Sequence, residues 1–121
     1  MVALEVLWLP QELVPSSLAD SRVVVIDVIR ATTSITTALA AGGQRVIPTG
    51  SVVAARSKAD RIGRSLLCGE RNGLPPEGFD FGNSPREFTP ELVAGESLIF
   101  TTTNGTAAIE AVGDARELRL A

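Results

Sequence analysis

The sequence predicts an α/β domain in which helices flank a mainly parallel β-sheet as a layered sandwich. Apolar, β-branched runs alternate with stretches of helical spacing, which is the pattern of strand-helix-strand units with right-handed crossovers. The run at residues 22–28, RVVVIDV, has no polar alternation, as is typical of a strand buried on both faces of a parallel sheet. The 121 residues are 45% hydrophobic, which is enough for a single α/β domain, residues 1–121, with its own core.

Six strands are predicted from apolar or β-branched runs that are bounded by Pro, Gly or polar residues. The first is the run ALEVLWL before Pro10, and the last is the run ELRLA. The strands are expected at residues 3–9, 22–28, 45–49, 65–69, 97–103 and 117–121. Because helical segments separate most of them, neighbouring strands should run parallel.

Three longer helices are predicted from apolar spacing and from residues that favour helix ends. Thr32 is the expected N-cap of a helix that ends at Gly42–Gly43, and Ser51 begins a second helix of about a dozen residues. The stretch GTAAIEAVG, from Gly105, predicts the third. Residues 84–87 combine a Ser N-cap, a first-turn Pro and a capping-box Glu, and so predict the start of a short helix.

Residues 69–84 form a long loop. Glycines and prolines interrupt this segment so often that no regular element is predicted, and loops of that length inside a domain are usually functional or disordered. The loop also carries charged and amide side chains, namely Glu70, Arg71, Glu77, Asp80 and Asn83. A functional loop is therefore expected.

What the sequence lacks excludes several functions. It has no His, which removes a Ser-His-Asp triad, phosphohistidine chemistry and His-ligated zinc from this chain. It has no P-loop motif, and its single Cys68 is interpreted as a buried small hydrophobe. The net charge of −3 disfavours nucleic acid or an anionic membrane as a partner. With no membrane-length apolar run and no signal-peptide pattern, we expect a cytoplasmic protein.

Side chains capable of chemistry gather where the predicted strands end. In open α/β sheets, ligands bind beyond the carboxyl ends of the strands. Residues 27–34, 69–84 and 101–106 each follow or close a predicted strand. The three segments are therefore expected to meet at one ligand site.

In the first segment, Asp27 closes an apolar strand, where a carboxylate needs a partner. Arg30 follows it at the start of the predicted helix, a place suited to an anion. The hydroxyls of Thr32, Thr33 and Ser34 can serve as additional donors. The alternative is that these hydroxyls only cap the helix and that Arg30 pairs with a surface carboxylate.

The other two segments offer oxygen ligands and hydrogen-bond donors. Glu70, Glu77 and Asp80 can supply carboxylate oxygens to Mg²⁺, which keeps several waters and bridges to a phosphate. Residues 101–106 form a run of hydroxyls at a strand end followed by Asn104-Gly105 before a helix, and so offer side-chain donors and free amides to a phosphate or carboxylate. The alternatives are a solvated loop and an ordinary helix cap.

Three stretches together resemble one known family, the 2-phosphosulfolactate phosphatases. These are VVVIDVIRATTSITTAL, LLCGERNGLPPEGFDFGNSPREF and LIFTTTNGTAAI. The resemblance implies a magnesium-dependent α/β enzyme that hydrolyses (2R)-2-phospho-3-sulfolactate to 3-sulfolactate and phosphate in coenzyme M biosynthesis. Because this chain resembles only the N-terminal half of a typical member, it is expected to be an incomplete part of a larger two-part fold.

The resemblance also implies roles for the residues that match those stretches. Asp27 and Glu70 would bind Mg²⁺ or orient the attacking water, and Arg30 and Arg71 would clamp the phosphate or sulfonate. The remaining candidates are donors to substrate, Thr32, Thr33, Ser34, Thr103, Asn104 and Gly105, and the second choices Glu77, Asp80 and Asn83. The alternatives are a phosphatase for another small phosphorylated acid and a non-catalytic anion-binding module or half-fold. Assembly into a homo-oligomer is left open.

Overall fold

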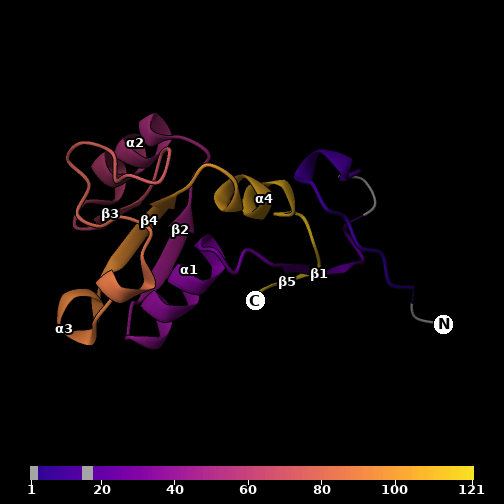
Figure 1. The fold of residues 1–121 in the computed structure, drawn as a ribbon, viewed down its shortest axis with the longest axis horizontal. Helices are drawn as coiled ribbons and strands as arrows, with labels where there is room; N and C mark the ends of the chain where they lie inside the picture. The colour runs from indigo at the N-terminus through magenta and orange to yellow at the C-terminus, as the bar shows by residue number, and fades with distance from the viewer. Residues whose placement is uncertain (1–2, 15–17) are drawn as a thin grey trace.

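The computed structural model describes residues 3–14 and 18–121, and its strands form two separate parallel sheets (Figure 1). The three-stranded sheet has the order β2 (Arg45–Pro48), β4 (Ser97–Thr101), β3 (Leu66–Gly69). The two-stranded sheet pairs β1 (Arg22–Val25) with β5 (Glu117–Leu120). All these pairings are parallel. The predicted α/β class is thus confirmed, but the strands are divided between two sheets.

Helices connect and cover the strands. The α-helices of the described residues are α1 (Ala31–Ala40), α2 (Val52–Ile62), α3 (Pro90–Val93) and α4 (Gly105–Ala111). Helix α2 packs on β3 and β4, whereas α1 packs beside β2. Helix α4 contacts both β1 and β2 and so joins the two sheets (Figure 1). None of these helices, in the described part of the chain, has the length and hydropathy needed to cross a membrane.

Strand β2 is an edge strand of the sheet in the described part of the chain, and Pro48 suits this position. The Thr49 N–H donates to the Phe100 carbonyl of β4 at 2.8 Å, so the nitrogen of the preceding Pro48 faces the opposite edge. Proline has no N–H to donate to a sheet ladder. An apolar groove of about 290 Å³, lined by residues of α1, β2, α4 and β5, lies beside this edge.

The hydrophobic core is built around β4, of which every residue is buried. On one face of the strand, the Phe88 ring lies between the rings of Phe81 and Phe100, at centroid distances of 5.7 and 5.6 Å. Cys68 of the neighbouring strand is fully buried, and this burial raises the pKa of its thiol. The interpretation of Cys68 as a small core residue is confirmed.

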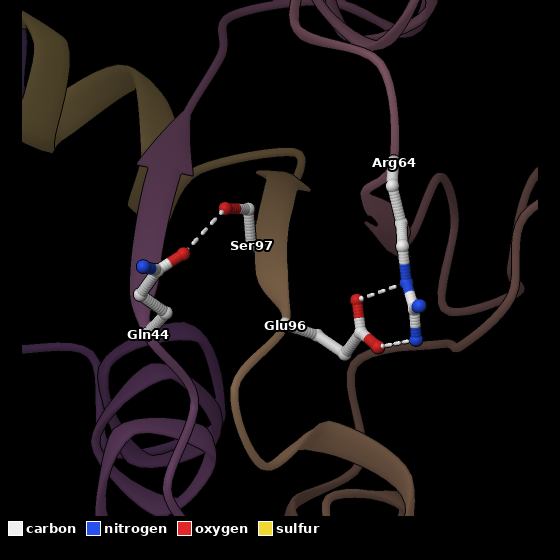
Figure 2. A network of polar contacts seen from close by, with 4 residues as sticks. All are labelled: Gln44, Arg64, Glu96 and Ser97. Carbon is white, nitrogen blue, oxygen red and sulfur yellow. Dashed lines mark hydrogen bonds and ion pairs between the residues drawn. The ribbon is translucent and has the colours of Figure 1, made fainter.

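Polar contacts fasten the amino ends of the three-stranded sheet (Figure 2). The Arg64 guanidinium, just before β3, makes a two-pronged ion pair with the Glu96 carboxylate, just before β4. The Ser97 hydroxyl donates to Gln44 Oε1 at 3.4 Å and accepts from Arg45 Nε at 2.9 Å. These contacts set the register of the strands at the end opposite the candidate site.

Two predicted helix starts are confirmed by local capping contacts, whereas the predicted N-cap Thr32 is wrong, because α1 begins at Ala31 with Arg30 as its N-cap. The Ser51 hydroxyl accepts from the Ala54 N–H at 3.0 Å and caps α2. The Glu87 carboxylate accepts from the Ser84 N–H at 3.0 Å, so the capping-box Glu is in place. The element that follows is a 3-10 helix, Pro85–Glu87.

The first predicted strand, residues 3–9, is wrong. Residues 3–7 have no regular structure, and a 3-10 helix follows at Pro10–Glu12. The apolar side chains of this segment are exposed, with Leu4 at 89% and Trp8 at 86%. A strand needs a neighbour for its backbone groups, and in the described residues β1 pairs only with β5.

Two predicted strands end earlier than expected, because threonine hydroxyls bond to the backbone after them and a helix begins there. Strand β1 stops at Val25, and the Asp27 N–H then donates to the Thr32 hydroxyl while the Asp27 carbonyl accepts from the Thr32 N–H. Strand β4 stops at Thr101, because the Thr102 N–H bonds to the Thr106 hydroxyl. Each exchange starts the helix that follows.

Candidate active site

The turn at residues 102–105, directly after β4, is the centre of the candidate site. Thr102 and Thr106 fix its shape, because the N–H of each donates to the hydroxyl oxygen of the other, at 2.9 and 3.1 Å. Both side chains are buried. Thr103 and Asn104 at the tip of the turn are exposed. The loops that follow β1 and β3 also reach this turn, as expected, although β1 belongs to the other sheet.

Glu70 joins the loop after β3 to this turn. Its Oε1 accepts from the Thr103 N–H at 2.7 Å, and its Oε2 accepts from the Thr103 hydroxyl at 3.1 Å and from the Gly73 N–H at 2.9 Å. The residue is only 9% exposed. Glu70 is therefore a brace between two loops that are distant in the sequence.

These donors keep the Glu70 carboxylate ionised. Burial by itself raises the pKa of Glu70, but the hydrogen bonds from Thr103 and Gly73, together with the nearby Arg71 guanidinium, lower it below its ordinary value. Glu70 is therefore an anion at neutral pH. Its environment suits it to holding donors in place and not to delivering a proton.

Arg71 extends the same brace to β4 and β2. Its Nη1 donates to the Glu70 carbonyl at 2.7 Å, and its Nη2 donates to Thr101 Oγ1 at 2.7 Å and to the Gly50 carbonyl at 3.3 Å. All these acceptors are neutral, and no carboxylate of the described residues forms an ion pair with it. The positive charge of Arg71 is positioned without being paired.

Asp27 lies against Gly105, the residue of the turn that has no side chain. A Cβ atom on Gly105 would be 2.7 Å from Asp27 Oδ2 and 2.3 Å from the Ala31 Cβ, so only glycine allows this approach. Within the described residues the Asp27 carboxylate accepts no hydrogen bond and forms no ion pair. It is half-buried and free to take a ligand.

Arg30 is the cation nearest to Asp27 in the sequence, and its side chain is also unpaired. It is the N-cap residue of α1 and half-buried. No hydrogen bond or ion pair from its guanidinium to a described residue is present. The alternative in which Arg30 pairs with a surface carboxylate therefore does not hold for the described part of the chain.

The hydroxyls of the first segment bond to the chain itself. Thr32 donates to the Ala121 carbonyl, Thr33 donates to the Val28 carbonyl at 2.8 Å, and Ser34 donates to the Asn83 carbonyl at 3.0 Å. Each hydroxyl has one hydrogen, so in this conformation none of the three is left to donate to an anion. They fix the start of α1 and tie it to the loop after β3.

Asn83 is the point where that loop meets α1. It is 7% exposed, and its Oδ1 is the one buried side-chain N or O atom of the described residues without a hydrogen-bond partner. Buried polar atoms are nearly always paired, so this oxygen is suited to a donor such as water. That Asn83 contacts substrate stays a prediction.

Comparison with known proteins decides the family. A family model described as 2-phosphosulpholactate phosphatase matches residues 8–121. The chain belongs to this family. It is similar to probable 2-phosphosulfolactate phosphatases of Clostridium acetobutylicum, with 50% identity over 100 residues, and of Caldanaerobacter subterraneus subsp. tengcongensis, with 50% identity over 105 residues. A third relative, from Carboxydothermus hydrogenoformans, is 42% identical over 115 residues.

The chain spans less than half the length of these phosphatases. The three alignments cover 82%, 85% and 95% of this chain but only 43%, 44% and 47% of the relatives. The expectation that the chain corresponds to about half of a typical family member is confirmed.

The predicted magnesium ligands of this phosphatase-family chain do not all come together. Asp80 Oδ2 accepts from the Leu67 N–H at 2.7 Å, near the amino end of β3, whereas Glu70 follows its carboxyl end. Glu77 is exposed, and its backbone carbonyl accepts from Arg56 of α2. No group of three or more His, Cys, Asp or Glu side chains that could hold a metal ion occurs in the described residues. Asp27 and Glu70 remain at the turn.

The sequence analysis included Thr101, Thr102 and Thr106 only as hydroxyl donors within the segment 101–106, and it missed Gly50. Thr101, Thr102 and Thr106 bond to Arg71 or to one another, and the Gly50 carbonyl accepts from Arg71. The Thr-x-x-x-Thr spacing at residues 102–106 was a readable signal, because hydroxyls placed so across a helix start commonly exchange backbone bonds. Nothing in the sequence pointed to Gly50.

Proposed function

We propose that the chain forms the phosphate-binding part of a magnesium-dependent phosphatase that hydrolyses (2R)-2-phospho-3-sulfolactate to 3-sulfolactate and phosphate. The observation that carries the proposal is a pair of unpaired opposite charges, the Asp27 carboxylate and the Arg30 guanidinium, in a chain of this family. They lie at the start of α1, and Asp27 also meets the turn after β4. The pathway we propose for this step is coenzyme M biosynthesis.

Arg30 would bind an anionic group of the substrate. A guanidinium presents a planar fork of donors that matches the oxygens of phosphate or sulfonate. Because Arg30 makes no internal ion pair with the described residues, no existing bond must be broken before it binds. Charge on the phosphate oxygens in the transition state would strengthen the same contact.

Asp27 can serve as a carboxylate ligand of a magnesium ion. Magnesium sites commonly use one or two carboxylates with waters and substrate phosphate, and they do not need a cage of three protein ligands. Asp27 Oδ2 and Oδ1 have no competing donor in the described residues. A bound Mg²⁺ would polarise the phosphoryl oxygens and activate water. The Asp27 carboxylate can also act by itself: it can orient a water molecule toward the phosphorus atom and accept a proton from that water.

Glu70 would act mainly by holding the turn in place, and Arg71 by presenting its charge from a fixed position. Glu70 holds the Thr103 N–H and hydroxyl, and so fixes the exposed tip of the turn next to the bound phosphate. Arg71 is held by neutral oxygens, so its charge can still attract the substrate. One carboxylate oxygen of Glu70 carries a single hydrogen bond, which leaves a lone pair for Mg²⁺ or for a water.

The same geometry also suits a phosphatase for another small phosphorylated acid, because the free charges identify a phosphate better than a sulfonate. A small phosphorylated substrate, and not nucleic acid or a membrane, is further supported by the net charge of −3 with no basic run. The single buried Cys68 is consistent with a cytoplasmic location, which we include in the proposal.

Phosphate release tests the proposal. The chain and the Clostridium acetobutylicum relative are each assayed with (2R)-2-phospho-3-sulfolactate and with a panel of other phosphorylated acids, in Mg²⁺ and in EDTA. We expect Mg²⁺-dependent phosphate release, either by the chain itself or by the chain joined to the rest of the relative. Asp27→Asn should abolish this release. Asp60→Asn, an exposed carboxylate on α2, is the matched control and should leave activity unchanged. Unchanged turnover in Asp27→Asn would remove Asp27 from the site.

A further inference from the structure

Strand β1 leads into an exposed apolar surface. Val24 is 53% exposed, Ile26 68%, Val28 62% and Ile29 87%. We call these four residues the β1 patch. Single exposed apolar side chains are ordinary, but several of them within one short segment indicate an interaction surface.

Among the described residues, the patch belongs to a sheet that has the core on one face only. In the β1–β5 ladder, Val25 opposite Leu120 faces the core, whereas Val24 opposite Arg119 lies on the other face. On that outer face, Glu117 forms ion pairs with its neighbours Arg22 and Arg119, beside the patch. Parallel sheets are found almost only with both faces covered, and two paired strands are marginal alone. The unalternating RVVVIDV sequence also predicts a strand buried on both faces.

The occupant that the observations favour is more of the same kind of polypeptide. Less than half of each curated relative aligns with this chain, although the aligned parts are up to 50% identical. The relatives therefore have the equivalent of β1 together with a large additional part. We propose that the β1 patch is the surface on which the remaining half of a full-length family member packs.

A second copy of the chain is a weaker candidate for the same surface. Stable interfaces use roughly 20–30 residues on each side. The patch has four apolar residues, and a two-copy contact would have to extend over the exposed Arg22 and Arg119. A half that is covalently joined needs less contact area, because the connection supplies a high effective concentration.

The position of the patch gives this packing a consequence for the site. Val28 and Ile29 lie between Asp27 and Arg30 in the sequence, so a part that covers them would also limit the access of water to both charges. The packing proposal itself rests on burial and on chain length, and it stands whether or not the proposed phosphatase activity does.

Urea unfolding tests the proposal in two proteins, the 121-residue chain and a chimera in which this chain is joined to the part of the Clostridium acetobutylicum relative outside the alignment. The variants are Ile26→Glu and Ile29→Glu, with Val53→Glu, a 78% exposed valine on α2, as the control. In the chain alone all three should leave the midpoint unchanged. In the chimera the two patch variants should lower it by about 1 M and the control should not.

Three outcomes would overturn the proposal. The first is a chimera in which the patch variants behave like Val53→Glu, and the second is a chimera without a cooperative transition. The third is a dimer of the 121-residue chain, measured by light scattering, that Ile26→Glu dissociates, because the occupant would then be a second copy. Ile29→Glu keeps the test decisive if Ile26→Glu disturbs folding of the chain alone, since Ile29 is 87% exposed.

Discussion

Replacing Glu70 by Gln should loosen the brace between the two loops of the site. Gln keeps one acceptor oxygen for the Thr103 N–H but places an NH2 group where Oε2 accepts from the Gly73 N–H and the Thr103 hydroxyl. The Thr103 hydroxyl can rotate and accept a hydrogen bond from the new NH2 group. The Gly73 N–H, however, then faces this NH2 group, which cannot accept a hydrogen bond. One charge-assisted hydrogen bond is lost, worth about 1.5–3 kcal/mol.

Water moderates that loss, because Gly73 is exposed and can be solvated. We therefore expect Glu70→Gln to lower the free energy of unfolding by about 2 kcal/mol. With a urea dependence of about 1–3 kcal/mol per molar, the midpoint should fall by about 1 M at pH 7. Circular dichroism during urea titration measures this. Glu77→Gln, whose carboxylate is exposed and accepts no hydrogen bond in the described residues, is the control and should not shift the midpoint.

The pH dependence gives the sharper test of this reasoning. The pKa of Glu70 is lowered in the folded protein, so its contribution to stability is fully present above the ordinary value of 4.5 and is lost as the pH falls through the folded-state pKa. A protonated Glu70 resembles Gln. The difference between wild type and Glu70→Gln should therefore shrink on acidification to about pH 3. A difference that is the same at both pH values, or absent at pH 7, would refute the brace.

Three further substitutions probe the packing and the free carboxylate. Gly105→Ala places a Cβ 2.3 Å from that of Ala31 and should cost about 1–3 kcal/mol in urea unfolding, whereas Gly113→Ala, which meets nothing nearer than 3.3 Å, should cost far less. Phe88→Ala removes the ring between two others and should cost about 3–5 kcal/mol in the same measurement. Asp27→Asn should leave the unfolding midpoint unchanged, because its side chain accepts no hydrogen bond in the described residues; a large destabilisation would contradict that assignment.

Local contacts explain which parts of the fold could be predicted. The caps at Ser51 and Ser84 involve residues three positions apart, so the sequence contains both partners of each bond. The meeting of the loops after β3 and β4 was predictable, because these parallel strands place their carboxyl ends at one edge. The loop after β1 comes from the other sheet and reaches the turn through Asp27 and Gly105. Residues 3–9 were mistaken for a strand because an apolar run does not reveal whether a neighbouring edge exists.

The roles within the site could not be predicted, because they depend on partners far away in the sequence. Glu70 and Thr103 are 33 residues apart, and Thr32 bonds to Ala121 across 89 residues. A carboxylate in a glycine-rich loop looks the same in sequence whether it is braced or free. The structure distinguishes the two carboxylates. Glu70 accepts three hydrogen bonds after the carboxyl end of β3, whereas Asp80 accepts one from Leu67 near the amino end of that strand.

Asp27 and Glu70 therefore have different roles at one turn, and the difference comes from their surroundings. Glu70 is buried under three donors that stabilise its charge, so a new ligand would have to compete with bonds that already exist. Asp27 lies half-buried against Gly105, and its carboxylate accepts no hydrogen bond in the described residues. In the phosphatase that we propose, a site that binds and releases an anion with every turnover would need both kinds of group, because the free carboxylate is useful only if the turn beside it does not move. Under that proposal Asp27 would exchange ligands and Glu70 would keep the turn rigid.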